Sequence, residues 1–324
     1  MDQICAQSGM VRVQDPRTRA IVELPGTESL AAALAACPMR FALDDAVTDT
    51  VTRLAFYPET IVGKALDLVR CPAPSLWLEF RGAARHGVFA DTGRLACGHD
   101  AAGGQRLGLL IESRNGGRAG TIASAWESTE GQPPDAAPFV IEFDFDTPIA
   151  DRAAEDGAWA MRITDFPPLE PLFRHVRFRL KPEWLAYYRE RCPDPARFGA
   201  VMDQVLQPAA EDVPFVAAFL LLMMSQQAVR LRPADLAALN RVRAKRGRTP
   251  LLDHSEMMLE IGEAGGIAGQ GDGIDGRAPS RLHLVRGHLV RRGPTIFWRN
   301  AHMRGRAELG RIERRSISLL QAAE

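Results

Sequence analysis

The sequence predicts a mixed α+β protein with an antiparallel-rich sheet, a central helical block and a basic C-terminal β-hairpin element. Three patterns lead to this fold class: strand-like alternation between residues 76 and 145, helical spacing between 182 and 228, and renewed alternation over 281–320. The 324 residues are 46% hydrophobic and 25% charged, which excludes a disordered or collagen-like chain. We expect residues 1–180 to form an α+β N-terminal domain.

The first part of this domain mixes short strands with helices. A strand is expected at 20–24, and Thr27 can cap a helix that runs to about Ala36. Pro58 can begin a second helix, since apolar residues follow it at helical spacing up to Val69. After a proline-rich break at 72–74 the period changes to two. Leu76, Leu78 and Phe80 are then expected on one face of a strand, with Trp77 and Glu79 on the other.

The rest of the domain is predicted to be mainly β. Further strands are expected at 87–90, 107–112 and 121–126. Asn115-Gly116 lies between the last two and favours a type I′ hairpin turn. The clearest alternation is at 139–145, with an aromatic, buried face and a mostly acidic, wet face.

Residues 181–262 are predicted as a helical block with a basic arm. Helices are expected to begin at Pro182, at Asp194 or Pro195, and at Asp212. The basic arm covers about 234–248, and a short strand is expected at 257–261. Residues 263–276 read as a glycine-rich linker or loop, and residues 277–324 as a basic β element of three strands that either folds alone or completes the first sheet.

Charge is unevenly placed along the chain. Lys+Arg and Asp+Glu are both 40, so the net charge is zero. Residues 230–248 nevertheless carry seven basic side chains against Asp235, and residues 277–315 carry eleven arginines against Glu308 and Glu313. A local excess of this kind is the electrostatic footprint of a polyanion site. The neutral total therefore does not exclude nucleic acid.

The densest group of reactive side chains lies in the C-terminal element. It contains His283, Arg286 and His288, and Arg304 would come near them in a hairpin across Gly293-Pro294. Imidazoles can move protons near neutral pH, and guanidinium groups can hold a phosphate. These four residues could therefore catalyse metal-independent RNA cleavage, or bind a phosphate backbone without reaction. A hairpin with merely solvated arginines is the remaining alternative.

Other residues are assigned to binding. Trp298 could stack on bases, and the basic residues together with one histidine could contact phosphates. This predicted set is Arg241, Arg243, Lys245, Arg246, Arg248, Arg291, Arg292, Trp298, Arg299 and His302. Glu79, next to an indole, is a second candidate base. The many arginines near the three C-terminal histidines would oppose a dication, so we expect no metal and no cofactor.

Three stretches carry a resemblance to known sequences. They are His283-x-x-Arg286-Gly287-His288-x-x-Arg291 with Trp298 and His302-x-Arg304-Gly305, then residues 74–80, and residues 239–251. In their order along the chain, with 74–80 first and the histidine-containing stretch last, they resemble a group of uncharacterised phage and prophage-associated bacterial proteins. The resemblance covers most of residues 60–310. It implies an origin in a mobile element and no particular reaction.

The leading hypothesis is therefore a prophage-associated accessory protein that binds RNA or DNA through its basic C-terminal hairpin. The alternatives are a metal-independent, nuclease-like phosphodiesterase and a non-enzymatic assembly protein with a phage or host protein as its partner. The first residues lack a basic region followed by an apolar run, and no apolar run is long enough to span a bilayer. We therefore expect a cytoplasmic protein with no membrane partner.

Overall fold

The computed structural model describes a set of segments that covers most of the chain up to residue 259 and five short strands beyond it. The described residues are 1–6, 9–14, 21–56, 61–91, 106–127, 134–150, 157–160, 169–225, 228–259, 281–285, 288–299, 302–304 and 306–311. The glycine-rich stretch predicted at 263–276 lies outside them.

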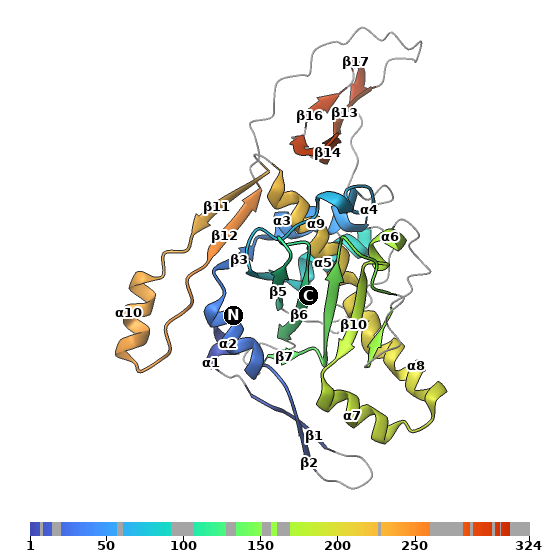
Figure 1. Cartoon of the computed structure of the whole chain (residues 1–324). Coiled ribbons are helices and arrows are strands. Elements are labelled where there is room, and N and C mark those ends of the chain that lie inside the picture. Colours follow the sequence, from blue (N-terminus) through green and yellow to red (C-terminus); the bar gives the residue numbers. More distant parts are fainter. Residues whose placement is uncertain are drawn as a thin grey trace, which may run out of the picture.

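A large mixed sheet forms the centre of the molecule (Figure 1). Within the described residues its strands follow the order β11-β12-β3-β4-β5-β6-β8-β10-β9, with β7 paired to β6. Strand β3 runs parallel to β4 and β12, and all other neighbours are antiparallel. The strands are β3 (Met39–Leu43), β4 (Ser75–Arg81), β5 (Arg106–Arg114), β6 (Ala119–Glu127), β7 (Asp135–Ala136), β8 (Phe139–Asp144), β9 (Ala158–Trp159), β10 (Val176–Leu180), β11 (Val229–Pro233) and β12 (Ser255–Leu259). The predicted α+β fold class is confirmed.

Helices cover both faces of this sheet. They are α1 (Asp2–Ala6), α2 (Glu28–Ala36), α3 (Asp45–Phe56), α4 (Ile61–Lys64), the 3-10 helix η1 (Leu66–Leu68), α5 (Gly82–Asp91), α6 (Glu170–Phe173), α7 (Pro182–Arg191), α8 (Pro195–Leu206), the 3-10 helix η4 (Gln207–Glu211), α9 (Asp212–Met224) and α10 (Ala237–Lys245). The main core lies between α3, α5 and α9 and one face of the sheet, whereas a smaller core lies between α1, α2 and the other face. Strand β4 shows the division. Leu76, Leu78 and Phe80 belong to the main core and Trp77 to the smaller one, as predicted.

Helix α9 lies at the middle of the main core. The side chains from Asp212 to Leu222 are all buried. Phe215 stacks on Phe80 of β4 with ring centroids 4.6 Å apart, and Phe219 lies 6.2 Å from Phe41 of β3. In the described part of the chain no single helix is long and apolar enough to cross a membrane. The bent pair of 195–206 and 209–224, with 51° between its halves, meets that criterion by length and composition only.

The hairpin predicted around Asn115-Gly116 is confirmed as β5–β6. Its loop is longer than the two-residue turn expected, because Arg114 pairs with Ala119 and four residues lie between them. Asn115, Gly116 and Gly117 all have positive φ, at 53°, 64° and 85°. A Cβ on Gly117 would lie 2.1 Å from the Cys71 carbonyl oxygen, so a larger residue could not occupy this position without a shift.

Some predicted elements were wrong. Residues 87–90 belong to helix α5 and not to a strand, because a short apolar run has no periodicity that separates the two. The second predicted helix is divided into α4 and η1, and the residues around Pro58 lie outside the described set. Strand β3 and helix α3 correspond to no prediction.

The described residues of the C-terminal part contain five short strands, whereas three were expected. In one small sheet β13 (Arg281–Val285) pairs with β16 (His302–Arg304) and β17 (Arg306–Arg311). A separate hairpin consists of β14 (His288–Arg292) and β15 (Thr295–Arg299). Near the N-terminus β1 (Val11–Gln14) and β2 (Ile21–Leu24) form a further hairpin. The C-terminal strands therefore do not complete the large sheet within the described residues.

Candidate nucleic-acid interface

The β14–β15 hairpin has two different faces. Residues directly opposite each other in an antiparallel pair lie on the same face, and successive residues alternate. The register therefore places Leu289, Arg291, Ile296 and Trp298 on one face, which we call the inner face. The outer face carries His288, Val290, Arg292, Thr295, Phe297 and Arg299.

The inner face attaches the hairpin to the rest of the protein. Leu289 and Ile296 are buried in the main core, and Trp298 packs against that core. Arg291 donates to both carboxylate oxygens of Asp67, each at 2.8 Å. The structure thus gives Arg291 and Trp298 a docking role in place of the predicted phosphate and base contacts. A guanidinium already paired with a carboxylate has little charge left for a phosphate.

The outer face keeps its charge available. Arg292 and Arg299 are exposed, and neither has an acidic partner among the described side chains. The Arg292 guanidinium carbon lies 5.3 Å from the centre of the Phe297 ring, a cation–π distance. The outer face thus carries two arginines, an aromatic ring and a histidine from the two strands, and these groups could contact a phosphate backbone.

The proposed catalytic residues are divided between two sheets. His283 stands directly opposite Arg304 in the β13–β16 pair, and His302 stands opposite Val285. His288 lies in the β14–β15 hairpin instead. Arg286 lies outside the described residues. The backbone therefore brings His283 and Arg304 together, and places His288 on a different pair of strands.

Glu79 does not join this group. Its carboxylate accepts hydrogen bonds from the Met1 ammonium at 2.7 Å and from Arg106 at 3.0 Å, on the face of the sheet that α1 and α2 cover. Burial alone would raise the pKa of Glu79, but these two cations outweigh it and leave the pKa below its ordinary value. The hairpin docks on the main core, at the other face. Glu79 is thus held ionised, away from the histidines, and is a poor candidate for a base.

The second basic region is the basic arm. It was predicted at about 234–248, and in the structure it extends over 234–254 between β11 and β12; from here on the name refers to this longer segment. Its helix α10 has no buried residue, and Figure 1 shows it projecting beyond the sheet. Polar contacts hold it in place. The Asn240 amide accepts from the Leu251 N–H at 2.7 Å and donates to the Leu251 carbonyl at 3.1 Å, and Arg243 donates to the Thr249 carbonyl at 2.8 Å.

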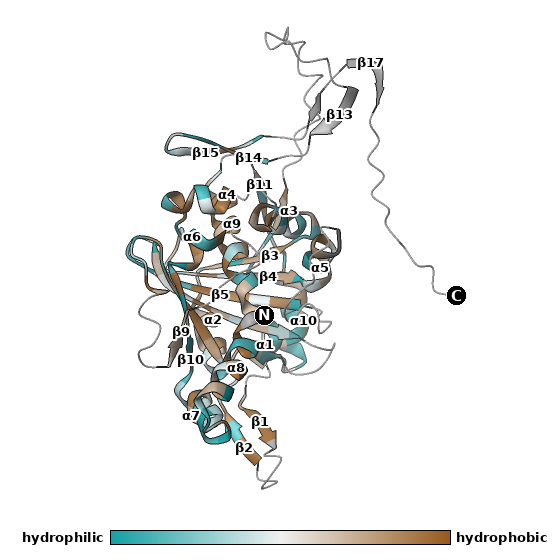
Figure 2. Ribbon diagram, turned by 90° about the vertical axis from the view of Figure 1, so that its right-hand side faces the viewer, coloured by the Kyte–Doolittle hydropathy of each residue, from teal (hydrophilic) through white to brown (hydrophobic). Residues whose placement is uncertain are grey.

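The exposed surface of the arm is basic with a small apolar part. Arg241, Lys245, Arg246 and Arg248 are all exposed and lack an acidic partner among the described side chains. Leu239 and Val242 are 49% and 46% exposed. Figure 2 shows the contrast, with mostly hydrophilic colouring on α10 and hydrophobic colouring along the central strands. Arg241 and Lys245 lie on the helix, whereas Arg246 is its C-cap and Arg248 follows in the loop.

Most arginines elsewhere are paired with carboxylates. Ion pairs link Arg12 to Glu23, Arg53 to Asp49, Arg81 to Asp45, Arg85 to Asp212, Arg106 to Glu79, Arg118 to Asp146, Arg174 to Glu170, Arg177 and Arg179 to Glu142, and Arg232 to Glu256. The acidic face predicted for strand 139–145 is part of this pattern, because Arg177 and Arg179 of β10 lie over Glu142. Basic side chains without a carboxylate partner among the described residues also occur elsewhere, but there they are scattered along the chain, for example at Lys64, Arg70, Arg114, Arg189, Arg197 and Arg230. In the arm and on the outer face of the hairpin they are grouped within short segments.

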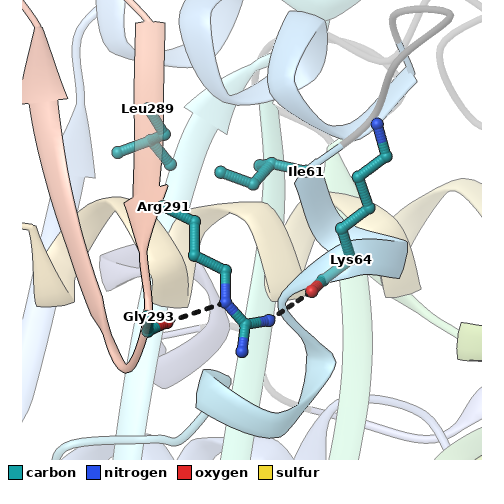
Figure 3. A pocket seen from close by; sticks show the side chains of 5 residues that line it. All are labelled: Ile61, Lys64, Leu289, Arg291 and Gly293. Atoms are coloured by element: carbon teal, nitrogen blue, oxygen red, sulfur yellow. Dashed lines mark hydrogen bonds between the residues drawn. The ribbon is translucent and has the colours of Figure 1, made fainter.

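A hollow of about 410 Å³ lies where the hairpin meets α4. Ile61, Lys64, Leu289, Arg291 and Gly293 line it (Figure 3). Sequence reasoning did not find Asp67, Ile61 or Lys64, because more than two hundred positions separate them from Arg291 and no local pattern links them. Among the described residues no group of three or more His, Cys, Asp or Glu side chains could hold a metal ion.

Comparisons with known proteins add no further assignment. No protein-family model, curated protein sequence or solved structure matches the chain. The function must therefore be argued from the geometry above.

Proposed function

We propose that this protein binds nucleic acid through the basic arm and the outer face of the β14–β15 hairpin. The observation that carries the proposal is the placement of unpaired charge. Arginines over the folded core are mostly neutralised by carboxylates, while Arg241, Lys245, Arg246 and Arg248 project into solvent without acidic partners in the described structure. Phosphate backbones attract such cations and release bound counterions.

The arm is suited to this role because its helix is ordered before it meets a partner. Asn240 and Arg243 fasten α10 to the loop that follows it, so binding would not require the helix to form. The arm is therefore the main contact surface in this proposal, in place of the C-terminal hairpin expected from the sequence. Arg292 and Arg299 supplement the arm, and Arg291 serves docking. The resemblance to phage and prophage-associated proteins would give such binding a setting in a mobile element.

The test compares two variants with the same loss of charge. Arg241→Gln/Arg246→Gln removes two arm charges, and Arg12→Gln/Arg174→Gln removes two exposed arginines that are already paired with Glu23 and Glu170. Binding to RNA and DNA is measured by fluorescence anisotropy between about 50 and 200 mM salt. We expect the arm variant to bind about tenfold more weakly, with the slope of log K against log salt reduced by roughly 2.

The control variant is expected to bind within about twofold of the unmodified protein, because paired surface charges contribute little outward potential. Equal losses in the two variants would mean that net charge alone matters and that the arm is not the interface. Absence of any salt-sensitive binding by the unmodified protein would reject the proposal as a whole.

A metal-independent, nuclease-like activity is the second proposal, and the register of His283 opposite Arg304 favours it. In such a reaction an imidazole could transfer a proton to a phosphate ester, and a guanidinium could stabilise the charge that develops on the phosphate. Cleavage of RNA is measured with a chelator present, for the unmodified protein and for His283→Ala and His288→Ala. If both variants cleave RNA as fast as the unmodified protein, catalysis by these histidines is rejected.

A further inference from the structure

The hollow beside the hairpin has a distinctive set of walls. Ile61 and Leu289 provide apolar sides, the Arg291 guanidinium provides a flat polar side, and Gly293 lies at the turn of the hairpin (Figure 3). Lys64 also lines it, and its ammonium group points away from Arg291 in this view. Lys64 is exposed and has no acidic partner among the described side chains.

Arg291 is held at almost all of its hydrogen-bonding positions. Its Nε donates to the Gly293 carbonyl at 3.0 Å, one terminal nitrogen donates to the Lys64 carbonyl and to Asp67, and the other donates to Asp67. A guanidinium carries five N–H groups, and these contacts use four of them. The N–H groups along the edge of the guanidinium are therefore almost all used, and these hydrogen bonds fix the orientation of its plane.

The flat surface of this guanidinium is not covered by another ring. No aromatic side chain stacks on Arg291 in the described part of the chain, and the side chain is 32% exposed. A guanidinium whose edge is satisfied cannot fork around a phosphate, but its flat surface can stack on a planar ring. The hollow therefore combines a fixed stacking surface, two apolar walls and one cation, Lys64, free to contact an anion.

We propose that this hollow accepts a single nucleobase, which stacks on Arg291 between Ile61 and Leu289 while the phosphate of the same nucleotide contacts Lys64. A base can enter such a site only when it is unpaired, because a base within a duplex must first leave its stack. If the base belongs to a nucleic-acid strand, the inference rests on the proposed function and makes single-stranded nucleic acid the preferred ligand. The same chemistry would also accept a free nucleotide.

The experiment uses a short single-stranded oligonucleotide with one 2-aminopurine, whose fluorescence falls when its ring stacks. The full-length protein is titrated with this oligonucleotide, with the matching duplex, and with 2-aminopurine riboside monophosphate as the free nucleotide. We expect fluorescence quenching with the single strand and about tenfold tighter binding of the single strand than of the duplex.

Two variants separate stacking from charge. Arg291→Lys keeps a cation next to Asp67 but has no plane, so it should lose the quenching and bind the single strand about tenfold more weakly, with duplex binding unchanged. Arg12→Lys, at an exposed arginine of β1 that is paired with Glu23 and lies outside the proposed interface, is the matched control and should keep the quenching. Lys64→Gln changes an exposed side chain, and substitutions at such positions have little effect on stability. It should keep the quenching and reduce the salt slope by about 1.

The outcomes distinguish this inference from the proposed function. Salt-sensitive binding with equal affinity for both strand forms and no quenching would overturn the hollow as a base site and leave the proposed function standing. If no oligonucleotide binds but the free nucleotide is quenched and Arg291→Lys abolishes that effect, the hollow is a nucleotide site and the proposed function fails. Quenching that persists in Arg291→Lys, or that is absent with every probe, overturns the inference.

Discussion

Arginines in the folded core and arginines in the basic arm are the same residue type in opposite circumstances. Arg85 of α5 is 2% exposed, donates to Asp212 and Glu211, and lies 5.4 Å from the Phe215 ring. Arg241 of α10 and Arg246, the C-cap that follows the helix, are both exposed, and the helix has no buried residue. Charge in the first region is balanced internally, whereas charge in the second is left for an outside partner.

The β14–β15 hairpin shows both circumstances within two adjacent residues. Arg291 faces inward and pairs with Asp67, and Arg292 faces outward and lies near Phe297. The difference follows from the alternation of side chains along a strand, which places neighbours on opposite faces. Counting arginines in a segment therefore overstates its capacity for polyanions. What matters is which of them the fold has already paired.

The largest expected effect comes from breaking a buried pair. Asp212 accepts from Arg85 at 2.8 Å and from the Ser124 hydroxyl at 2.8 Å, and it is almost completely buried. Asp212→Ala would remove one carboxylate from the buried Arg85 cation, while the ion pair with Glu211 stays. We expect a loss of about 3 kcal/mol in the free energy of unfolding, the lower end for a broken buried pair because Glu211 remains.

Urea denaturation measures this loss, and Arg246→Ala in the arm is its control, with an expected change within about 0.5 kcal/mol. A loss below about 1 kcal/mol for Asp212→Ala would mean that core arginines are no more dependent on their partners than arm arginines. The comparison between the two regions would then fail.

A smaller effect is expected for the partly buried pair on the sheet surface. Burial alone would raise the pKa of Glu142, but the hydrogen bonds and charges of Arg179 and Arg177 lower it below its ordinary value. A depressed carboxyl pKa stabilises the fold above the ordinary pKa, near 4.3, and this contribution is lost as the pH falls through the lower folded value. Glu142→Gln should cost about 1–2 kcal/mol at neutral pH.

The pH dependence identifies the cause of that loss. Melting temperatures of Glu142→Gln and the unmodified protein should differ by a constant amount above about pH 5, and the difference should disappear as the pH falls through the lowered folded pKa. Glu170→Gln, which breaks an exposed pair with Arg174, is the control and should change stability by at most about 0.5 kcal/mol. A gap that persists into acid would show that the Glu142 carboxylate charge is not the stabilising group.

Much of the fold could be predicted from local patterns. Alternation placed Leu76, Leu78 and Phe80 on one face of β4, and Asn115-Gly116 marked the β5–β6 hairpin. Elements without a distinct period were the ones mistaken. Val88 and Phe89 are buried in α5, but a run that short is equally compatible with a strand. The division of the chain into separate domains stays a prediction.

The candidate site was predicted in its composition but not in its geometry. The cations of the arm and hairpin could be identified from the sequence, because the amino-acid type alone determines which side chains are positively charged. Which of them are paired depends on contacts such as that of Arg291 with Asp67, two residues that are 224 positions apart in the sequence. Single-sequence patterns hold no information on such contacts. Trp298, which was expected to stack on bases, lies on the inner face of the hairpin and packs against the main core.

The smallest change in overall stability is expected where the arm is fastened. Asn240→Ala removes both hydrogen bonds to Leu251, yet no apolar core lies beneath α10. The arm should open locally, so the free energy of unfolding of the whole protein should change by less than about 0.5 kcal/mol, while amide exchange in 237–245 becomes roughly tenfold faster. Nucleic-acid binding should weaken severalfold, because the helix must then be ordered on binding.

Val242→Ala, an exposed residue on the same helix, is the control and should leave exchange nearly unchanged. A global loss above about 2 kcal/mol for Asn240→Ala would place the arm within the cooperative core, and its cations would then have to be explained as part of that structure.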